Sequence, residues 1–314
     1  MKKILIIKLG YSETIGERSS KTPSLGDVLR TTFVLRYFKR KQIYWLVDEQ
    51  ALPLLKHNKH IDKICIYNAS SLKKLRKKHF YAVLNLEKSS AICKFSDALR
   101  ADFYFGFTSA TSQKRRCFKG CEKLLRISED ARARRRNVDS WQKILAAALN
   151  QKWNGERYIL GYKPRSKIRY DVGFNWTTGS KWKNKSWPLA YWQELENLLE
   201  KDCSISWQKG LRNLYQYIDW IHACRLVVTA DTLGLHIALA LRKKVVALFG
   251  PTSHTEIDFY GCGSAMLPTV SYKCIPCLET FCNRKNPCMR FISPQSVKKK
   301  VMHELKKDLV PREL

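Results

Sequence analysis

The chain has 314 residues, with 58 Lys and Arg against 27 Asp and Glu, so its formal net charge is +31. This length allows two domains of ordinary size, and a hydrophobic share of 45% is normal for a globular protein. No run of about twenty apolar residues is present, which excludes a typical membrane-spanning helix. The charge favours polyanionic partners, such as phosphorylated substrates, anionic lipid or nucleic acid.

The first apolar run, Ile4 to Ile7, is interrupted by Lys8. It is too short for the core of a signal peptide, so we expect a first β-strand in a cytoplasmic protein. The 11 cysteines are therefore expected to be buried, free or bound to metal rather than paired in disulfides.

The first half of the chain alternates short apolar runs with stretches of helical periodicity. Strands are expected at residues 3–9, 43–47, 64–67 and 81–86, and helices after residue 27 and at 51–56, 72–77 and 91–99. Repeated strand–helix units of this kind predict a parallel, doubly wound α/β sheet.

Two features follow the first strand. A polar stretch from Gly10 to Pro23 has no apolar period and is either a lid over a substrate or a tolerated surface insertion. Ser24, Gly26 and Asp27 then precede a helix. Gly26 would permit a tight turn, and Asp27 at a helix N-terminus would be kept ionised and able to take a proton from a hydroxyl. The alternative is that Ser24 or Asp27 only caps the helix.

The middle of the chain is basic. Residues 114–136 show no clear apolar period and are expected to be a surface excursion in which Cys117 and Cys121 are free thiols. A helix is expected at 138–149 and an inter-domain linker at 151–169.

The second half centres on residues 226–252, which read as strand, polar corner, helix and strand. Ligands of open α/β sheets bind beyond the carboxyl ends of strands, where helix N-termini offer free N–H groups. The corner carries Asp231, Thr232, Gly234 and His236, which suits a phosphorylated ligand with hydroxyl groups. The alternative is an ordinary corner with a capping Asp231 and a structural His236.

Three motifs occur in the order found in one family. The first motif is Ser24–Leu25–Gly26–Asp27, and the second is Trp182 with Lys185 and Trp187–Pro188. The third is Asp231–Thr232 with His236 and Val245–Thr252. Together they resemble glycosyltransferase family 9, the ADP-heptose:lipopolysaccharide heptosyltransferases. The chain departs from the family pattern at Leu233, where the family has Gly, and in the long stretch before Ser24.

This resemblance implies a GT-B fold, with two Rossmann-like doubly wound domains facing a central cleft. Residues 1–160 would bind the acceptor and residues 161–314 the nucleotide-sugar. Transfer would be inverting and metal-independent, with catalytic residues Asp27 and Lys185. The resemblance places the donor at Asp231, Thr232, Gly234 and His236, and an acceptor or phosphate loop at Ser24 and Gly26.

The partners expected from the resemblance are a nucleotide-sugar donor and a phosphorylated, lipid-linked glycan acceptor. The enzyme would act in the cytoplasm, peripherally at the inner membrane, where basic clusters at residues 73–78 and 114–116 would contact anionic lipid. No nucleic-acid partner is expected, because no known reader motif accompanies the charge. A nucleotide-sugar epimerase of the same architecture and a basic nucleic-acid-binding protein remain the alternatives.

Four cysteines lie close together in the sequence near the C-terminus: Cys274, Cys277, Cys282 and Cys288. They could hold a structural Zn or Fe ion, although each spacing is individually common. No cofactor is expected for catalysis. The donor base, the sugar, the acceptor, the linkage and the oligomeric state are left open by the sequence.

Overall fold

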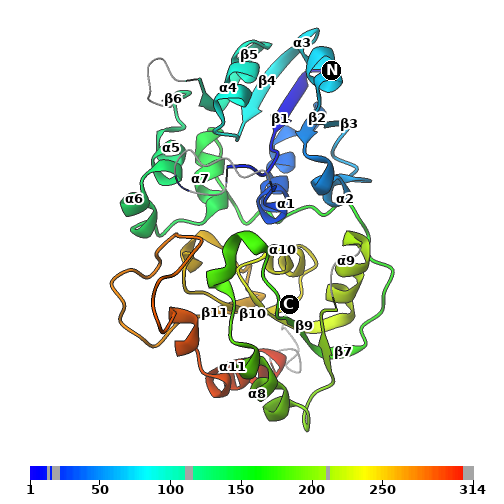
Figure 1. The fold of residues 1–314 in the computed structure, drawn as a ribbon. Coiled ribbons are helices and arrows are strands. Elements are labelled where there is room, and N and C mark those ends of the chain that lie inside the picture. Colours follow the sequence, from blue (N-terminus) through cyan, green and yellow to red (C-terminus); the bar gives the residue numbers. More distant parts are fainter. Residues whose placement is uncertain (13–14, 16–21, 110–115, 210–212, 307–314) are drawn as a thin grey trace. The chain divides into compact units, whose positions relative to one another are not determined.

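The computed structural model describes residues 1–12, 15, 22–109, 116–209 and 213–306 (Figure 1). The chain divides into two compact units, Met1–Tyr162 and Lys163–Leu314. Lys114 and Arg115 of the predicted basic cluster, and residues 13–14 and 16–21 of the predicted loop, lie outside the described residues. Within the described part of the chain, no helix combines the length and apolar character that crossing a bilayer requires.

The first unit is built on one twisted sheet. Its strands are β1 (Lys3–Ile7), β2 (Gln42–Val47), β3 (Lys63–Ile66), β4 (His79–Asn85), β5 (Arg100–Thr108) and β6 (Arg116–Cys117), in the order β3-β2-β1-β4-β5-β6. Strands β1 to β5 pair in parallel and β6 pairs antiparallel to β5. The helices are α1 (Leu25–Thr31), η1 (Thr32–Phe38), η2 (Glu49–Ala51), α2 (Leu52–Leu55), α3 (Ala69–Arg76), α4 (Ser90–Asp97), α5 (Glu122–Glu129), α6 (Ala131–Arg135) and α7 (Trp141–Ala148).

Alternate side chains of β1 enter two different cores. Ile4 and Ile6 pack with residues of α1, α5 and α7, whereas Leu5 and Ile7 pack with residues of α3 and α4. Successive side chains of a strand point to opposite faces, so this division means that the helices cover both faces of the sheet. The first unit is therefore doubly wound, as the sequence predicts.

The second unit has a separate parallel sheet. Its strands are β7 (Tyr170–Asn175), β8 (Ile205–Trp207), β9 (Cys224–Ala230), β10 (Lys244–Leu248) and β11 (Gly263–Met266), in the order β11-β10-β9-β7-β8. The helices are η3 (Ser180–Lys185), α8 (Leu189–Leu199), α9 (Leu214–Ala223), α10 (Leu233–Ala240), η4 (His254–Glu256), η5 (Cys288–Phe291) and α11 (Pro294–Lys306). Phe174, Trp192 and Val301 belong to the core on the α8 and α11 side.

Each sheet contains one topological switch point, at which successive connections leave for opposite sides of the sheet. In the first unit it lies between β1 and β4, and in the second between β7 and β9. Open α/β sheets bind ligands in the crevice beyond the carboxyl ends of the two strands at such a point. The residues directly after these four strands are therefore the first place to look for a site.

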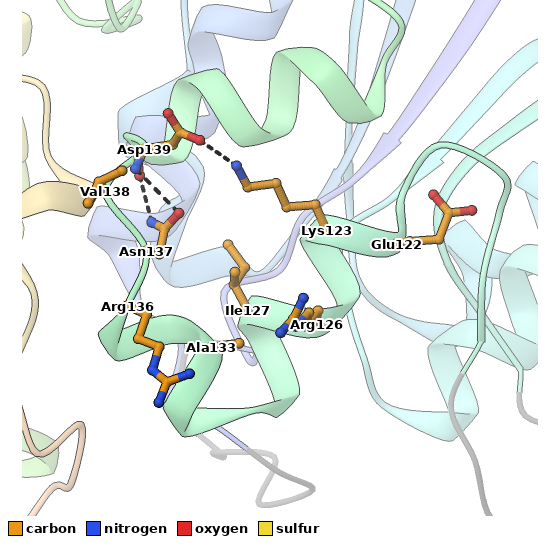
Figure 2. A pocket seen from close by; sticks show the side chains of 9 residues that line it. All are labelled: Glu122, Lys123, Arg126, Ile127, Ala133, Arg136, Asn137, Val138 and Asp139. Atoms are coloured by element: carbon orange, nitrogen blue, oxygen red, sulfur yellow. Dashed lines mark hydrogen bonds and ion pairs between the residues drawn. The ribbon is translucent and has the colours of Figure 1, made fainter.

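The structure corrects the expected surface excursion at residues 114–136. This stretch contains β6 and two helices, α5 and α6, which Figure 2 shows side by side around Ala133. Cys121, Leu124 and Ile127 are buried in the main core at helical spacing. The surrounding lysines and arginines obscure that period in the sequence, because they occupy the solvent face of the same helices.

Candidate active site

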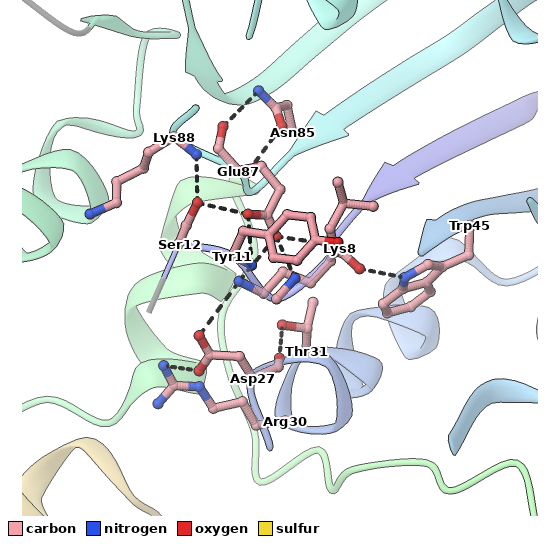
Figure 3. Close-up of polar contacts among 12 residues, drawn as sticks. Lys8, Tyr11, Ser12, Asp27, Arg30, Thr31, Trp45, Asn85, Glu87 and Lys88 are labelled. Atoms are coloured by element: carbon pink, nitrogen blue, oxygen red, sulfur yellow. Dashed lines mark hydrogen bonds and ion pairs between the residues drawn. The ribbon is translucent and has the colours of Figure 1, made fainter. Parts of the chain in front are cut away.

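Asp27 lies in the first turn of α1 between two cations (Figure 3). The Arg30 guanidinium approaches Asp27 Oδ1 at 2.6 Å, and Lys8 Nζ lies 3.6 Å from Oδ2. All three residues are buried. Two neighbouring cations and a helix N-terminus stabilise the ionised form of a carboxylate, which is the form a general base requires.

Glu87, just beyond β4, fixes the backbone that leaves β1. Its Oε1 accepts hydrogen bonds from the N–H groups of Leu9 and Gly10 at 2.7 and 2.8 Å. Its Oε2 accepts from the Ser12 hydroxyl at 2.7 Å and from a further backbone N–H. Lys8 Nζ lies 3.6 Å from Glu87 as well, so Lys8 connects this fully buried carboxylate to Asp27. The network occupies the switch point of the first unit.

The tight turn at this site is at Gly10 rather than at Gly26. Gly26 lies within the first turn of α1, whereas Gly10 has a φ of +98° and a Cβ there would meet the Ser24 carbonyl at 2.9 Å. The Ser24 N–H donates to the Gly10 carbonyl at 2.7 Å. Ser24 is the N-cap residue of α1, but its side chain makes no capping hydrogen bond. Helix capping by the hydroxyl therefore does not account for a serine at this position.

In the second unit, Asn175 at the end of β7 ties together the residues that follow β9. Its Nδ2 donates to the hydroxyls of Thr229 and Thr232 at 2.7 and 3.0 Å, and its Oδ1 accepts from Tyr217 at 2.7 Å. Thr232 is the N-cap of α10 and accepts from the Gly234 N–H. A Cβ on Gly234 would lie 2.5 Å from both Asn175 and Tyr217, so this network requires glycine at that position.

Lys185, Asp231 and His236 meet at the same switch point. Lys185 Nζ donates to the Asp231 carbonyl at 2.8 Å and forms an ion pair with its Oδ2 at 3.0 Å. His236 Nε2 lies 4.0 Å from Oδ1 of the same carboxylate. Burial alone would raise the pKa of Asp231, but the charge of Lys185, the neighbouring His236 imidazole and hydrogen bonds from Lys185 and Thr252 outweigh it and hold that pKa at about 2. Asp231 is thus a largely buried carboxylate, with its side chain 15% exposed, that stays ionised.

The four C-terminal cysteines line one pocket of about 190 Å³. Burial and, secondarily, the neighbouring thiols raise the pKa of Cys288 to about 11, and the same causes raise the pKa of Cys277. Four thiols are a suitable donor set for Zn or Fe. However, within the described ranges no three His, Cys, Asp or Glu side chains are already grouped as a metal site. None of the 11 cysteines is in a disulfide.

The structure thus brings together Lys185, Asp231, Thr232, Gly234 and His236, as expected from the sequence, and places Ser24 and Gly26 beside Asp27. The sequence analysis missed Lys8, Arg30, Glu87 and Asn175. Lys8, Glu87 and Asn175 are polar residues at or just beyond the end of a buried strand. A search for polar residues at strand ends on both sides of each switch point would have found them.

Two Rossmann-like doubly wound units in one chain define the GT-B class. Solved structures support this class over nearly the whole chain. The glycosyltransferase family 9 protein from Veillonella parvula has a TM-score of 0.66 at 17% identity, with 98% of each chain covered. The E. coli ADP-heptose lps heptosyltransferase II has a TM-score of 0.66 at 15% identity, covering 99% of this chain and 100% of that one.

The family is indicated by sequence. Residues 210–287 match the model of Glycosyltransferase family 9 (heptosyltransferase). Lipooligosaccharide heptosyltransferase 2 of Campylobacter jejuni is 34% identical over 89 residues, which cover 28% of this chain and 27% of that relative. The resemblance to family 9 is therefore confirmed, and the family model matches the segment that contains Asp231 and His236.

Proposed function

We propose that this protein is an inverting glycosyltransferase that moves a heptose from ADP-heptose to a lipopolysaccharide or lipooligosaccharide acceptor, without a divalent metal ion. The observation that carries the proposal is the cluster of Lys185, Asp231 and His236 at the switch point of the second unit. This cluster includes two residues of the segment that matches the family 9 model.

The donor would bind at this cluster. Lys185 supplies a point charge for the diphosphate, and the N-terminus of α10 supplies N–H groups and the positive end of the helix dipole. Lys185 is held by Asp231, so the diphosphate would have to share the ammonium group with that carboxylate. Because the pKa of Asp231 is about 2, Asp231 remains an acceptor for a sugar or ribose hydroxyl at neutral pH.

In the transfer step, Asp27 takes the proton of the acceptor hydroxyl as that oxygen bonds to the anomeric carbon. The bond from the anomeric carbon to the diphosphate oxygen breaks, and the nucleotide diphosphate leaves with the electron pair. Attack from the opposite face inverts the anomeric configuration. Lys185 and the α10 N-terminus would stabilise the negative charge on the departing diphosphate, the role that a divalent ion has in other transferases.

The test is a transfer assay with ADP-heptose and a lipid-linked core acceptor that lacks its heptose. We expect release of ADP that depends on the acceptor, persists in EDTA, and gives a product of inverted anomeric configuration by NMR. An arm without acceptor separates the epimerase alternative, since an epimerase converts the sugar nucleotide by itself. Absence of ADP release, or conversion of the donor without acceptor, contradicts the proposal.

A further inference from the structure

The ammonium group of Lys8 is shared between two carboxylates (Figure 3). Its Nζ lies 3.6 Å from Asp27 Oδ2 and 3.6 Å from Glu87 Oε1. The side chains of these three residues are at most 7% exposed, so solvent and salt screen their charges little. Asp27 also pairs with Arg30. Two cations and two carboxylates therefore form one buried group whose formal charges cancel.

The negative charge of Glu87 is more than the local backbone requires. A neutral amide oxygen could accept the N–H groups of Leu9 and Gly10 equally well. Without that charge, however, Asp27 would face two cations and a helix N-terminus, which keep a carboxylate ionised but weaken its affinity for a proton. A general base works best when its proton affinity matches the working pH. Glu87 opposes the weakening, because it holds the other side of Lys8.

Other charged or titratable side chains lie on the segments around this group. Among the described residues they are Arg30 on α1, Arg36 and Tyr37 on η1, Tyr11 after β1, Asp48 and Glu49 at η2, Lys88 after β4 and Lys143 on α7. Arg30 keeps its charge at every working pH. Burial and the hydrogen bond to Asp48 raise the pKa of Tyr11, so its phenol stays neutral. Replacing Lys8 or Glu87 therefore changes the charge beside the base while Arg30 is unaltered.

We propose that Glu87 is a positioning residue that sets the basicity of Asp27 through Lys8. In this role Glu87 contacts Lys8 and the backbone after β1 rather than the reacting atoms. Its charge keeps the base anionic at the working pH and still able to accept the proton of a hydroxyl group. The inference rests on the proposed function, in which Asp27 is the base.

The test measures single-turnover transfer from ADP-heptose against pH, because single turnovers separate the chemical step from product release. The proteins are the wild type, Lys8→Gln, Glu87→Gln and the double variant Lys8→Gln/Glu87→Gln. Glutamine at residue 87 keeps the size of the side chain and an oxygen for the backbone N–H groups. The matched control is Lys8→Gln/Asp48→Asn, since the Asp48 carboxylate is bound to Tyr11 of the same stretch instead of to Lys8. Melting temperatures verify that each protein is folded.

We expect Lys8→Gln to move the acid limb of the profile up by about one pH unit, because Asp27 then lies near a second carboxylate without their shared cation. Adding Glu87→Gln should return the limb by about as much, a recovery of about tenfold in rate on the acid side. Glu87→Gln alone should move the limb down and lower the plateau rate about threefold, as a weaker base does. The control should show no recovery.

Losses that add in the double variant, without a return of the acid limb, overturn the inference and leave Glu87 with the backbone alone. An unmoved limb in Lys8→Gln, or an equal recovery in the control, overturns it too. Where Lys8→Gln does not fold, Glu87→Gln alone decides, and a profile like that of the wild type is the contrary result. Wild-type transfer rates in Asp27→Asn would refute the proposed base itself, whatever the variants at residue 87 do.

Discussion

The Asp27 carboxylate lies between two buried cations, whose positions are set by packing. Lys8 and Arg30 are both less than a tenth exposed and both contact its carboxylate. A carboxylate in this position is held in one orientation and is kept ionised. The same arrangement means that neutralising Asp27 leaves two buried cations with less compensation, so loss of stability and loss of catalysis must be measured separately.

Asp27→Asn should abolish transfer while leaving donor binding nearly intact. Loss of a general base costs roughly a hundredfold to ten-thousandfold in rate. Steady-state transfer, ADP affinity and melting temperature should be measured on one preparation. Asp102→Asn is the control, because the Asp102 carboxylate is about half exposed and pairs only with His79 among the described residues. Near-normal turnover by a folded Asp27→Asn protein would remove this residue from the mechanism.

Lys185→Ala and His236→Ala should both weaken nucleotide binding. For the lysine variant the loss should be about tenfold for ADP and much smaller for AMP, because a charged hydrogen bond to the diphosphate is removed. Lys183→Ala is the matched control, since Lys183 is an exposed lysine two residues away in the same helical turn. If ADP and AMP were affected equally, Lys185 would not be bound to the diphosphate.

Sequence motifs identify single candidate site residues well, but they do not identify the residues that contact them in the folded structure. Asp231 and His236 are five residues apart on one corner, so local spacing is enough to pair them. Glu87 bonds to backbone groups about 77 residues away, at Leu9 and Gly10. Such contacts depend on which strands are adjacent in the sheet. The pairing of β1 with β4 depends on the whole fold and cannot be predicted from either segment alone.

At the scale of elements, the packing of α10 against β7 depends on the absence of one side chain. Gly234→Ala places a methyl group 2.5 Å from Asn175 Nδ2 and Tyr217 Oη. We expect it to destabilise the protein by about 1–3 kcal/mol in urea unfolding, as overpacking does, and to weaken ADP binding. Gly179→Ala is the control, because its Cβ would meet nothing within 4 Å and its φ of −62° suits alanine. An unchanged Gly234→Ala protein would show that the Asn175 network can relax without cost.

The cysteine pocket is the second test at this scale. We predict about one structural Zn or Fe ion per chain at Cys274, Cys277, Cys282 and Cys288, measured by elemental analysis of purified protein. Cys277→Ser should reduce the metal content and the melting temperature, whereas Cys203→Ser, outside this pocket, should not change the metal content. A folded, active and metal-free preparation would contradict the prediction. Transfer itself should survive chelators in either case.

Elements with strong apolar runs were predictable, and those without them were not. Strands β1, β2 and β4 are buried along most of their length and were expected within two residues of their observed bounds. Strand β5 was missed because its first half is largely exposed, β8 because it has three residues, and β11 because Gly263–Met266 has little strand propensity. Each of these three strands pairs in parallel with a more buried neighbour, β4, β7 or β10.

For the whole molecule, a net charge of +31 is well above what solubility requires. We predict reversible binding to anionic membrane surfaces. Each Lys or Arg near such a surface contributes on the order of 1 kcal/mol, so four or five well-placed residues suffice. On α3, Lys73, Lys74 and Arg76 are exposed and adjacent, and the next residue, Lys77, is exposed as well.

Co-sedimentation with liposomes measures this. Binding should need anionic lipid and be released by a few hundred millimolar salt, because the attraction is screened within about a Debye length. Replacing Lys73, Lys74 and Lys77 with Gln should reduce it, while the same number of changes at Lys298, Lys299 and Lys306, on α11 of the second unit, should matter less. Equal binding to neutral and anionic vesicles, or none to either at low salt, would falsify the prediction.

The hydrogen bond from the Ser24 N–H to the Gly10 carbonyl has a consequence for how this protein can be changed. The chain returns at Ser24 to the point that it left at Gly10, so the two ends of the intervening stretch are held together, and its first two residues are also bonded to Glu87. Lengthening such a stretch costs only about 0.6 kcal/mol for each doubling. Sequences of different length can therefore be exchanged between Ser12, whose hydroxyl is bonded to Glu87, and Ser24 while Asp27 keeps its place, which makes this stretch a natural position for insertions.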